Sequence, residues 1–228
     1  MKKIITITTL AASLFVFGCA TNKCENCECG CQGGWVPLFG GGLSGADYDP
    51  QIWSVSKDGV LTATKDVPIF SKKSWENFEL EFDFLLDNGT NSGVFVYCSD
   101  VKHYVPKSIE VQIADNAKFG KPRTDCGSIY GLVPAEFDTA LPVGIWQRMK
   151  VRCEGKKIDA WINGRHCSKM DMSKWTDEKT NPDGSAIPPW LAKGKKCDLP
   201  TCGKIGFQGK HGKANISLRN IRIKNISK

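Results

Sequence analysis

The sequence predicts an all-β fold, a two-sheet antiparallel β-sandwich of the jelly-roll type. After residue 34, apolar and polar residues alternate with a period of two, and apolar stripes with helical spacing are scarce. Asp-Gly, Asn-Gly and Glu-Gly dipeptides separate the alternating runs, as expected for hairpin turns. We expect about a dozen strands, which is too many for the alternative, an immunoglobulin-like sandwich of about 100 residues.

The clearest strands are runs in which every second residue is apolar and most residues between them are polar or charged. They cover residues 78–84, 109–114, 148–153, 157–162 and 215–226. In the last run the apolar phase changes between Leu218 and Ile221, which predicts a β-bulge near Arg219 and Asn220. Residues 169–200 form the one long stretch without such alternation, and a loop of that length inside a domain is often functional.

The first 18 residues have the pattern of a bacterial lipoprotein signal peptide. Lys2 and Lys3 precede an apolar run that is shorter than the ~20 residues a membrane span needs, and Gly18-Cys19 closes it. We therefore expect cleavage before Cys19, lipidation of Cys19 and anchoring of the mature protein to a membrane of the bacterial cell envelope. An ordinary secretory signal or an N-terminal anchor helix is the alternative.

The chain thus divides into a signal peptide (residues 1–18), a tether (residues 19–34) and one domain (residues 35–228). The tether is rich in Asn, Gly and Cys and lacks large apolar residues, so we expect it to be flexible. Its cysteines are close enough to wrap one zinc ion, but no surrounding segment would fold around the metal. Disulfides or modified thiols are the preferred interpretation for Cys24, Cys27, Cys29 and Cys31.

The chain has 11 cysteines, which leaves an even number once Cys19 is lipidated. Export makes disulfides possible, and the spacing favours Cys153–Cys167. Cys197 and Cys202 could close a small loop, which leaves Cys98–Cys126 by elimination, but spacing does not settle the connectivity. The formal charge of +7 is spread along the chain without a basic block that contains aromatic residues. Nucleic acid is therefore not an expected partner.

A candidate site lies on the strand of residues 109–114. Ile109, Val111 and Ile113 point to one side of this strand. Glu110 and Gln112 therefore share the other side, ~6.6 Å apart along the strand. A carboxylate beside an amide suits sugar hydroxyls, which need donors and acceptors, and a partly buried Glu can serve as an acid or base. The alternative is an ordinary solvent-facing strand.

Other candidate residues lie in loops and at strand ends. His211 is surrounded by glycines in residues 206–212. A histidine side chain can accept and donate protons, although a lone histidine in a loop is often inert. Arg219 is a candidate contact for an anion or carbonyl group, with a surface salt bridge as the alternative. Candidate sugar contacts are Asn91, Asp115 and Trp161, and Trp175 and Trp190 of the long loop could line a groove.

Several short motifs recur in a fixed order along the chain. They are residues 35–39, 78–82, 91–95, 110–113, 129–132, 161–164, 206–212 and 219–221. Together they resemble the 3-keto-disaccharide hydrolase domain family over residues 34–228. The resemblance implies a concanavalin-like jelly roll that acts on glycosides oxidised at C3. Members typically carry an acidic residue just before the loop histidine, whereas Gly209 and Lys210 precede His211 here. This difference argues against a carboxylate that orients His211.

The substrate class implied by this resemblance suggests a mechanism. A ketone at C3 acidifies the C2 proton, so the glycosidic oxygen at C1 can leave by elimination, and water then adds back. This needs a base, an acid and an electrophile for the enolate oxygen. We assign Glu110 as acid or base, His211 as its proton-transfer partner, and Arg219 or a divalent cation as the electrophile. Hydroxyl contacts are expected from Gln112, Asn91, Tyr130 and Gln208.

Three other classes remain open at this point. A non-catalytic carbohydrate-binding lipoprotein would bind glycans for uptake without forming product. A conventional retaining glycosidase needs two carboxylates about 5–5.5 Å apart, whereas Glu110 and Gln112 supply only one. A structural envelope protein would have no groove over its polar strand faces.

Overall fold

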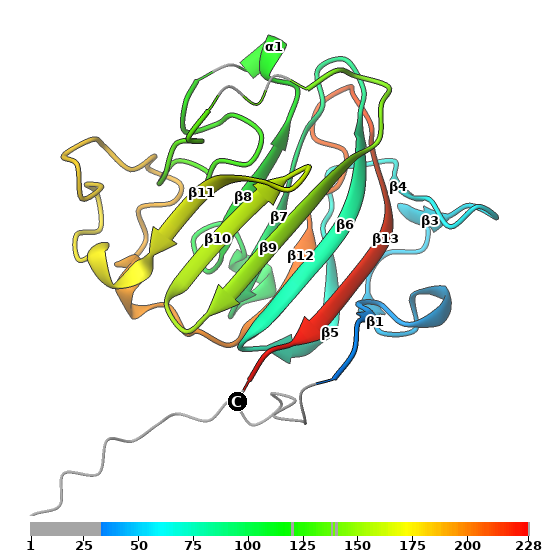
Figure 1. The fold of residues 1–228 in the computed structure, drawn as a ribbon, viewed down its shortest axis with the longest axis horizontal. Coiled ribbons are helices and arrows are strands. Elements are labelled where there is room, and N and C mark those ends of the chain that lie inside the picture. The colour runs from blue at the N-terminus through cyan, green and yellow to red at the C-terminus, as the bar shows by residue number, and fades with distance from the viewer. Residues whose placement is uncertain (1–32, 120, 138, 140, 228) are drawn as a thin grey trace, which may run out of the picture.

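The computed structural model describes residues 33–119, 121–137, 139 and 141–227, and most of its regular structure is β-strand. Two antiparallel sheets pack face to face, with the larger sheet in front in Figure 1. The predicted all-β sandwich is therefore confirmed. The signal peptide, Cys19 and the tether cysteines lie outside the described residues. No helix in the described part is long and apolar enough to cross a membrane.

The larger sheet has eight strands in the order β11-β10-β9-β6-β13-β4-β3, with β1 also paired to β13. These strands are β1 (Val36–Pro37), β3 (Trp53–Val55), β4 (Leu61–Ala63), β6 (Phe78–Leu86), β9 (Gln147–Glu154), β10 (Lys157–Ile162), β11 (Arg165–Asp171) and β13 (Ile216–Asn225).

The smaller sheet has five strands in the order β2-β5-β12-β7-β8. These are β2 (Ala46–Asp47), β5 (Ile69–Trp75), β7 (Asn91–Cys98), β8 (Ile109–Ala114) and β12 (Gly203–Phe207). The helical segments are short: α1 (Asn116–Phe119), and the 3-10 turns η1 (Gly41–Leu43), η2 (Val101–His103), η3 (Met172–Lys174) and η4 (Lys196–Asp198).

The core lies between the two sheets and is built from alternate residues of the strands. On β6, Phe82 and Phe84 are buried, and on β12 Phe207 is buried as well. The rings of Phe82 and Phe207 meet edge to face at 4.9 Å, which joins the two sheets. Because side chains alternate along a strand, the remaining row on each strand faces outward and is available for other roles.

The predicted bulge and one predicted turn are confirmed in detail. The pairing of β13 with β6 shifts register between Arg219 and Arg222, and Asn220 adopts a left-handed backbone with φ 54°. Between β10 and β11, Asn163 and Gly164 both have positive φ, 51° and 82°. A two-residue hairpin turn of the I′ type needs this at both positions.

The predicted disulfides are wrong, because the six cysteines of the described part are thiols. Cys153 lies on β9 and Cys167 on β11, with β10 between them. Two strand spacings amount to about 10 Å, beyond the ~7 Å over which a disulfide can join two Cα atoms. Cys98 belongs to a small outer cluster, whereas Cys126 lies in the main core. Burial raises the pKa of the Cys126 and Cys167 thiols to about 12, so these groups are unreactive.

The contact between the sheets gives a stability test. We expect Phe82→Ala to lower the free energy of unfolding by about 3–5 kcal/mol, because it leaves a cavity where the two sheets meet. Val55→Ala is the control, since Val55 is 43% exposed, and it should change the free energy by less than about 1 kcal/mol. Urea unfolding followed by tryptophan fluorescence measures both, and equal losses for the two variants would contradict this account of the core.

Candidate functional site

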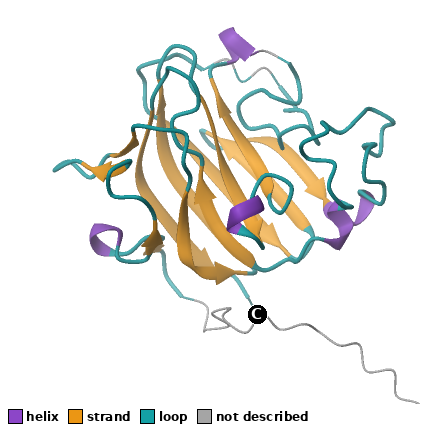
Figure 2. Ribbon diagram, turned by 180° about the vertical axis from the view of Figure 1, so that it is seen from behind, coloured by secondary structure: helices purple, strands orange, loops and turns teal. Residues whose placement is uncertain are grey.

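The candidate site lies on the outer face of the five-stranded sheet. Ile109, Val111 and Ile113 of β8 are buried in the core between the sheets. Glu110 and Gln112 therefore point outward, where loops extend over this sheet (Figure 2).

Glycines on the neighbouring strands make room for the side chains of this face. A Cβ at Gly93 of β7 would lie 2.1 Å from Oε1 of Glu110. A Cβ at Gly206 of β12 would lie 2.4 Å from the ring of Phe70. The absence of side chains at these two positions lets Glu110 lie across β7 and lets Phe70 lie across β12.

An apolar patch of Phe70, Phe95, Cys98 and Tyr104 lies on the same outer face. Tyr104 comes from the loop after η2, and its ring centroid is 4.9 Å from that of Phe95. Phe95 is the cross-strand partner of Glu110, so the patch borders the carboxyl group. This packing removes water from one side of Glu110.

Glu110 has a strongly perturbed carboxyl group. Burial raises the pKa of Glu110 to about 8, and the negative charge of Asp66 adds to the rise. Its carboxyl group makes no hydrogen bond to another described residue. At neutral pH the group is therefore largely protonated and can donate a proton.

His211 contacts a carboxylate that sequence reasoning missed. Its Nδ1 atom lies 2.5 Å from Oδ2 of Asp66, which follows β4. A carboxylate at Nδ1 favours the tautomer in which Nδ1 carries the proton and Nε2 can accept one. Gln208 lies beside the same ring, with its Nε2 atom 3.5 Å from Nδ1.

The residues just before His211 explain how Asp66 reaches it. The backbone N–H of Lys210 donates to the carbonyl of Lys65 at 2.9 Å. A Cβ at Gly209 would lie 2.3 Å from the same carbonyl oxygen, so only glycine permits this approach. Gly209 and Lys210 thus dock the loop against the segment that carries Asp66. The carboxylate missing next to His211 in the sequence is supplied by a distant segment, and no local pattern around Asp66 predicts it.

Four further predicted residues lie at this site. Gln112 donates from Nε2 to Oδ1 of Asn91 at 3.0 Å, and its buried Oε1 accepts no hydrogen bond from any described residue. That oxygen is shielded from solvent, so the structure leaves it as an unsatisfied acceptor beside Asn91. Burial and the charge of Glu110 raise the pKa of the Tyr130 hydroxyl, which places that hydroxyl near the carboxyl group. The backbone N–H of Gln208 donates to the carbonyl of Gly93 at 2.9 Å.

Two loops that border the site are joined by a buried lysine. Lys196 is 1% exposed, and its Nζ donates to the carbonyls of Pro106 at 3.1 Å and Leu191 at 2.9 Å. Pro106 follows Tyr104, and Leu191 follows Trp190, which is 54% exposed. Trp190 is therefore an accessible aromatic group, and its side chain lies beside that of Tyr130. Trp175 is instead buried, with its Nε1 donating to Asn181.

Three predicted site residues lie elsewhere. Arg219 is on β13 of the eight-stranded sheet, 3.5 Å from Asp83 and stacked on Trp146 at 4.0 Å. Trp161 is on β10 of that same sheet, with its ring 5.2 Å from His166. Both face outward on the opposite side of the sandwich from Glu110, so neither can contact a sugar bound there.

The third of these residues, Asp115, is buried. Its two oxygens accept hydrogen bonds from the backbone N–H groups of Gly89 and Ala117, so it holds loops rather than a ligand. Arg219 and Trp161 do occupy the polar rows of their strands, but the sequence did not indicate to which sheet each strand belongs.

Nothing in the described part resembles a ready metal centre. No group of three or more His, Cys, Asp or Glu side chains gathers there in a way that could hold a metal ion. Glu110, Asp66 and His211 do not form such a set. The described residues therefore offer no ready site for the divalent cation named as the alternative to Arg219, and the chemistry below assigns no step to one.

Residues 34–224 match the family model of the 3-keto-alpha-glucoside-1,2-lyase-like domain. The chain belongs to this family. A 3-keto-disaccharide hydrolase from Bacteroides thetaiotaomicron is 32% identical to this chain over an alignment of 185 residues, and the match covers 68% of this chain. The chain spans 60% of the length of that relative.

Solved structures agree with the fold of the lyase-like domain. A protein from Parabacteroides distasonis, provisionally named a glycosyl hydrolase, is 49% identical and has a TM-score of 0.82, covering 85% of this chain and 100% of that one. A Bacillus subtilis protein of unknown function with a galectin-like fold has a TM-score of 0.54 at 12% identity, covering 86% of this chain and 96% of that one. The predicted family and the jelly-roll fold are thus confirmed.

Because the pKa of Glu110 is raised in the folded state, the free energy of unfolding should depend on pH. A group whose pKa is higher in the folded than in the unfolded state stabilises the fold below its unfolded pKa, and this contribution is lost as the pH rises through the folded value. For Glu110 that window runs from about 4.5 to about 8. As the pH rises from 4.5 to 8, we expect the free energy of unfolding of Glu110→Gln to increase relative to that of wild type by on the order of 5 kcal/mol.

Urea unfolding at pH 4.5, 6 and 8 measures this difference. The control is Glu76→Gln, which removes an exposed carboxyl group between β5 and β6 and should show no such trend. A constant difference between Glu110→Gln and wild type at all three pH values would show that the carboxyl group is solvated.

Proposed function

We propose that this domain cleaves 3-keto-glycosides, such as 3-keto-disaccharides, by elimination followed by hydration. The observation that carries the proposal is a largely protonated carboxyl group, Glu110, on the same sheet face as the Asp66–His211 pair. One group can donate a proton while the other accepts one, which is what this reaction needs. The name of the Bacteroides thetaiotaomicron relative supports the same substrate class.

In the first half of the reaction, Nε2 of His211 takes the C2 proton of the bound sugar. The electron pair forms an enolate with the C3 carbonyl, and Asp66 stabilises the imidazolium that results. The enolate then expels the glycosidic oxygen from C1, which leaves a C1–C2 double bond conjugated with the C3 ketone. Glu110 donates its proton to the leaving oxygen, so the aglycone departs as an alcohol.

In the second half, the Glu110 carboxylate accepts a proton from water as the water oxygen bonds to C1. The imidazolium of His211 returns a proton to C2, and both groups regain their starting states. The net change is hydrolysis of one glycosidic bond. Since Arg219 lies on the other side of the sandwich, the hydroxyl of Tyr130 is our candidate donor to the C3 oxygen. Gln112, Asn91 and Gln208 would bind the sugar hydroxyls.

The acid role of Glu110 predicts the pH dependence of turnover. Activity on a 3-keto-glucoside should fall as the pH rises through about 8, because Glu110 then loses the proton that the leaving group needs. Glu110→Gln and His211→Ala should each lower kcat by about 10²–10⁴-fold. Asp66→Asn should lower kcat by about 10–100-fold. The loss is smaller because Asp66 orients His211 and stabilises its charged form but does not contact the sugar.

Mass spectrometry of the released sugar and aglycone measures turnover, and Glu76→Gln is the control with unchanged activity. Wild-type rates in both Glu110→Gln and His211→Ala would refute the assignment. Tight binding of the same glycosides without any product would instead favour a non-catalytic carbohydrate-binding protein, a role that the exposed Trp190 would also suit.

We also propose that Cys19 carries the lipid that holds the domain at the cell envelope. The support is the signal pattern of residues 1–18. Labelled palmitate should be incorporated into the wild-type protein and not into Cys19→Ser, and the variant should move from the membrane fraction to the soluble fraction. Cys24→Ser, in the adjacent tether, is the matched control and should keep the label. Labelling of Cys19→Ser would rule out this anchor.

A further inference from the structure

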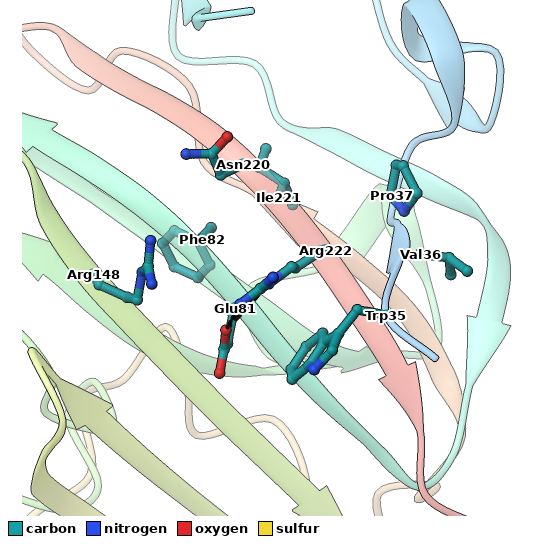
Figure 3. Close-up of a pocket in the computed structure, with 9 residues that line it drawn as sticks. All are labelled: Trp35, Val36, Pro37, Glu81, Phe82, Arg148, Asn220, Ile221 and Arg222. Carbon is teal, nitrogen blue, oxygen red and sulfur yellow. Dashed lines mark hydrogen bonds and ion pairs between the residues drawn. The ribbon is translucent and has the colours of Figure 1, made fainter. Parts of the chain in front are cut away.

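A hollow of about 580 Å³ opens on the outer face of the eight-stranded sheet, on the opposite side of the sandwich from Glu110. Figure 3 shows Trp35 and Arg222 at one side of it and Arg148 at the other, with Glu81 between them. Its volume lies in the range of small-molecule sites. We propose that this hollow is a second carbohydrate-binding site, which takes a pyranose unit of an oligosaccharide. The proposal does not depend on the chemistry assigned to Glu110.

The backbone of β13 is distorted where it borders the hollow. Successive residues of a strand normally face opposite sides, but the register shift between Arg219 and Arg222 breaks this alternation. As a result Arg219 and Asn220 both turn to Asp83 on the outer face, and Arg222 also faces outward to Glu81. Asn220 adopts a positive φ to allow this, a conformation that costs free energy in a residue other than glycine. The bulge thus concentrates polar side chains at one point of the sheet.

These polar side chains keep unused hydrogen-bonding groups. Arg148 bonds Oδ1 of Asp83 through Nε at 2.9 Å, and its two Nη groups donate to no described residue. Arg222 bonds one oxygen of Glu81, Oε2, through Nε and Nη2. The Oε1 atom of Glu81 and the Oδ1 atom of Asn220 therefore remain as acceptors within the described part. Donors and acceptors side by side suit the hydroxyl groups of a sugar.

The hollow also has an apolar wall. Trp35 and Pro37, at the start of the domain, border it, and the guanidinium of Arg222 holds the Trp35 ring at 4.9 Å. An indole beside hydrogen-bonding groups matches a pyranose ring, which has apolar C–H faces and polar edges. Among the residues that line the hollow, Arg148 and Arg222 outnumber Glu81, so its charge favours neutral or acidic sugars over cations.

The residues around the hollow come from motifs that the Glu110 site leaves without a role. Trp35 and Pro37 belong to the motif of residues 35–39, Glu81 to that of residues 78–82, and Asn220 to that of residues 219–221. They converge from three parts of the chain onto one surface. A glycan bound in this hollow would keep its free ends close to the protein, which raises their effective concentration at other binding sites on the same molecule.

The test uses the mature chain with Cys19→Ser, so that it stays in solution. Hexasaccharides of gluco, galacto and manno configuration, not oxidised at C3, are titrated while the indole N–H signal of Trp35 is followed by NMR. At least one should shift this signal with saturation. Trp35→Ala should weaken the binding of that glycan at least tenfold while leaving turnover of a small 3-keto-glucoside within twofold of wild type.

Two further variants make the result decisive. Arg148→Ala leaves the first strand intact and should weaken binding at least fivefold, which covers the case in which Trp35→Ala disturbs β1. Trp190→Ala removes an exposed indole on the other side of the sandwich and should leave the Trp35 response unchanged. If no glycan shifts the Trp35 signal, or if Trp35→Ala and Arg148→Ala both bind like wild type, the proposal is overturned.

Discussion

The long strands of the sandwich each commit one row of side chains to the apolar core between the two sheets, and the rest of the structure depends on this constraint. The edge-to-face contact of Phe82 and Phe207 lies at the centre of that core. Because the inner rows are occupied, polar chemistry is confined to the two outer faces. The two faces then differ in what covers them. Loops lie over the five-stranded sheet, whereas charged side chains cover the eight-stranded one.

On the five-stranded sheet, small residues and loops create a place where a carboxyl group loses contact with water. Gly93 lets Glu110 lie against the sheet, and Tyr104 brings an aromatic ring to the neighbouring Phe95. Lys196 holds the covering loops from beneath by bonding their carbonyls. The proton affinity of Glu110 is therefore a property of the whole sheet face and its loops. A similar Glu-Val-Gln run on an open sheet face would hold an ordinary, ionised carboxylate.

On the eight-stranded sheet the outward row is an ordered network of ion pairs and stacked rings. Arg219 lies over Trp146, Lys150 over Trp161, and Arg222 over Trp35. Exposed ion pairs contribute little to the free energy of unfolding on their own. Stability alone therefore does not account for an arrangement this regular. A ligand that contacts both the rings and the charges would account for it. In that case the outer face of the five-stranded sheet would carry out the reaction, and the outer face of the eight-stranded sheet would bind the glycan.

The sequence by itself determined the class of fold, the strands with a period of two, the bulge in β13 and the outward direction of Glu110 and Gln112. These follow from alternation along one strand, which is a local property. Tertiary structure alone decided which outward rows share a face. It separated Arg219 and Trp161 from Glu110, it held Cys153 and Cys167 apart with β10 between them, and it brought Asp66 to His211 across 145 positions. Sheet order and loop contacts join residues that are distant in the chain, and no local pattern of side chains carries that information.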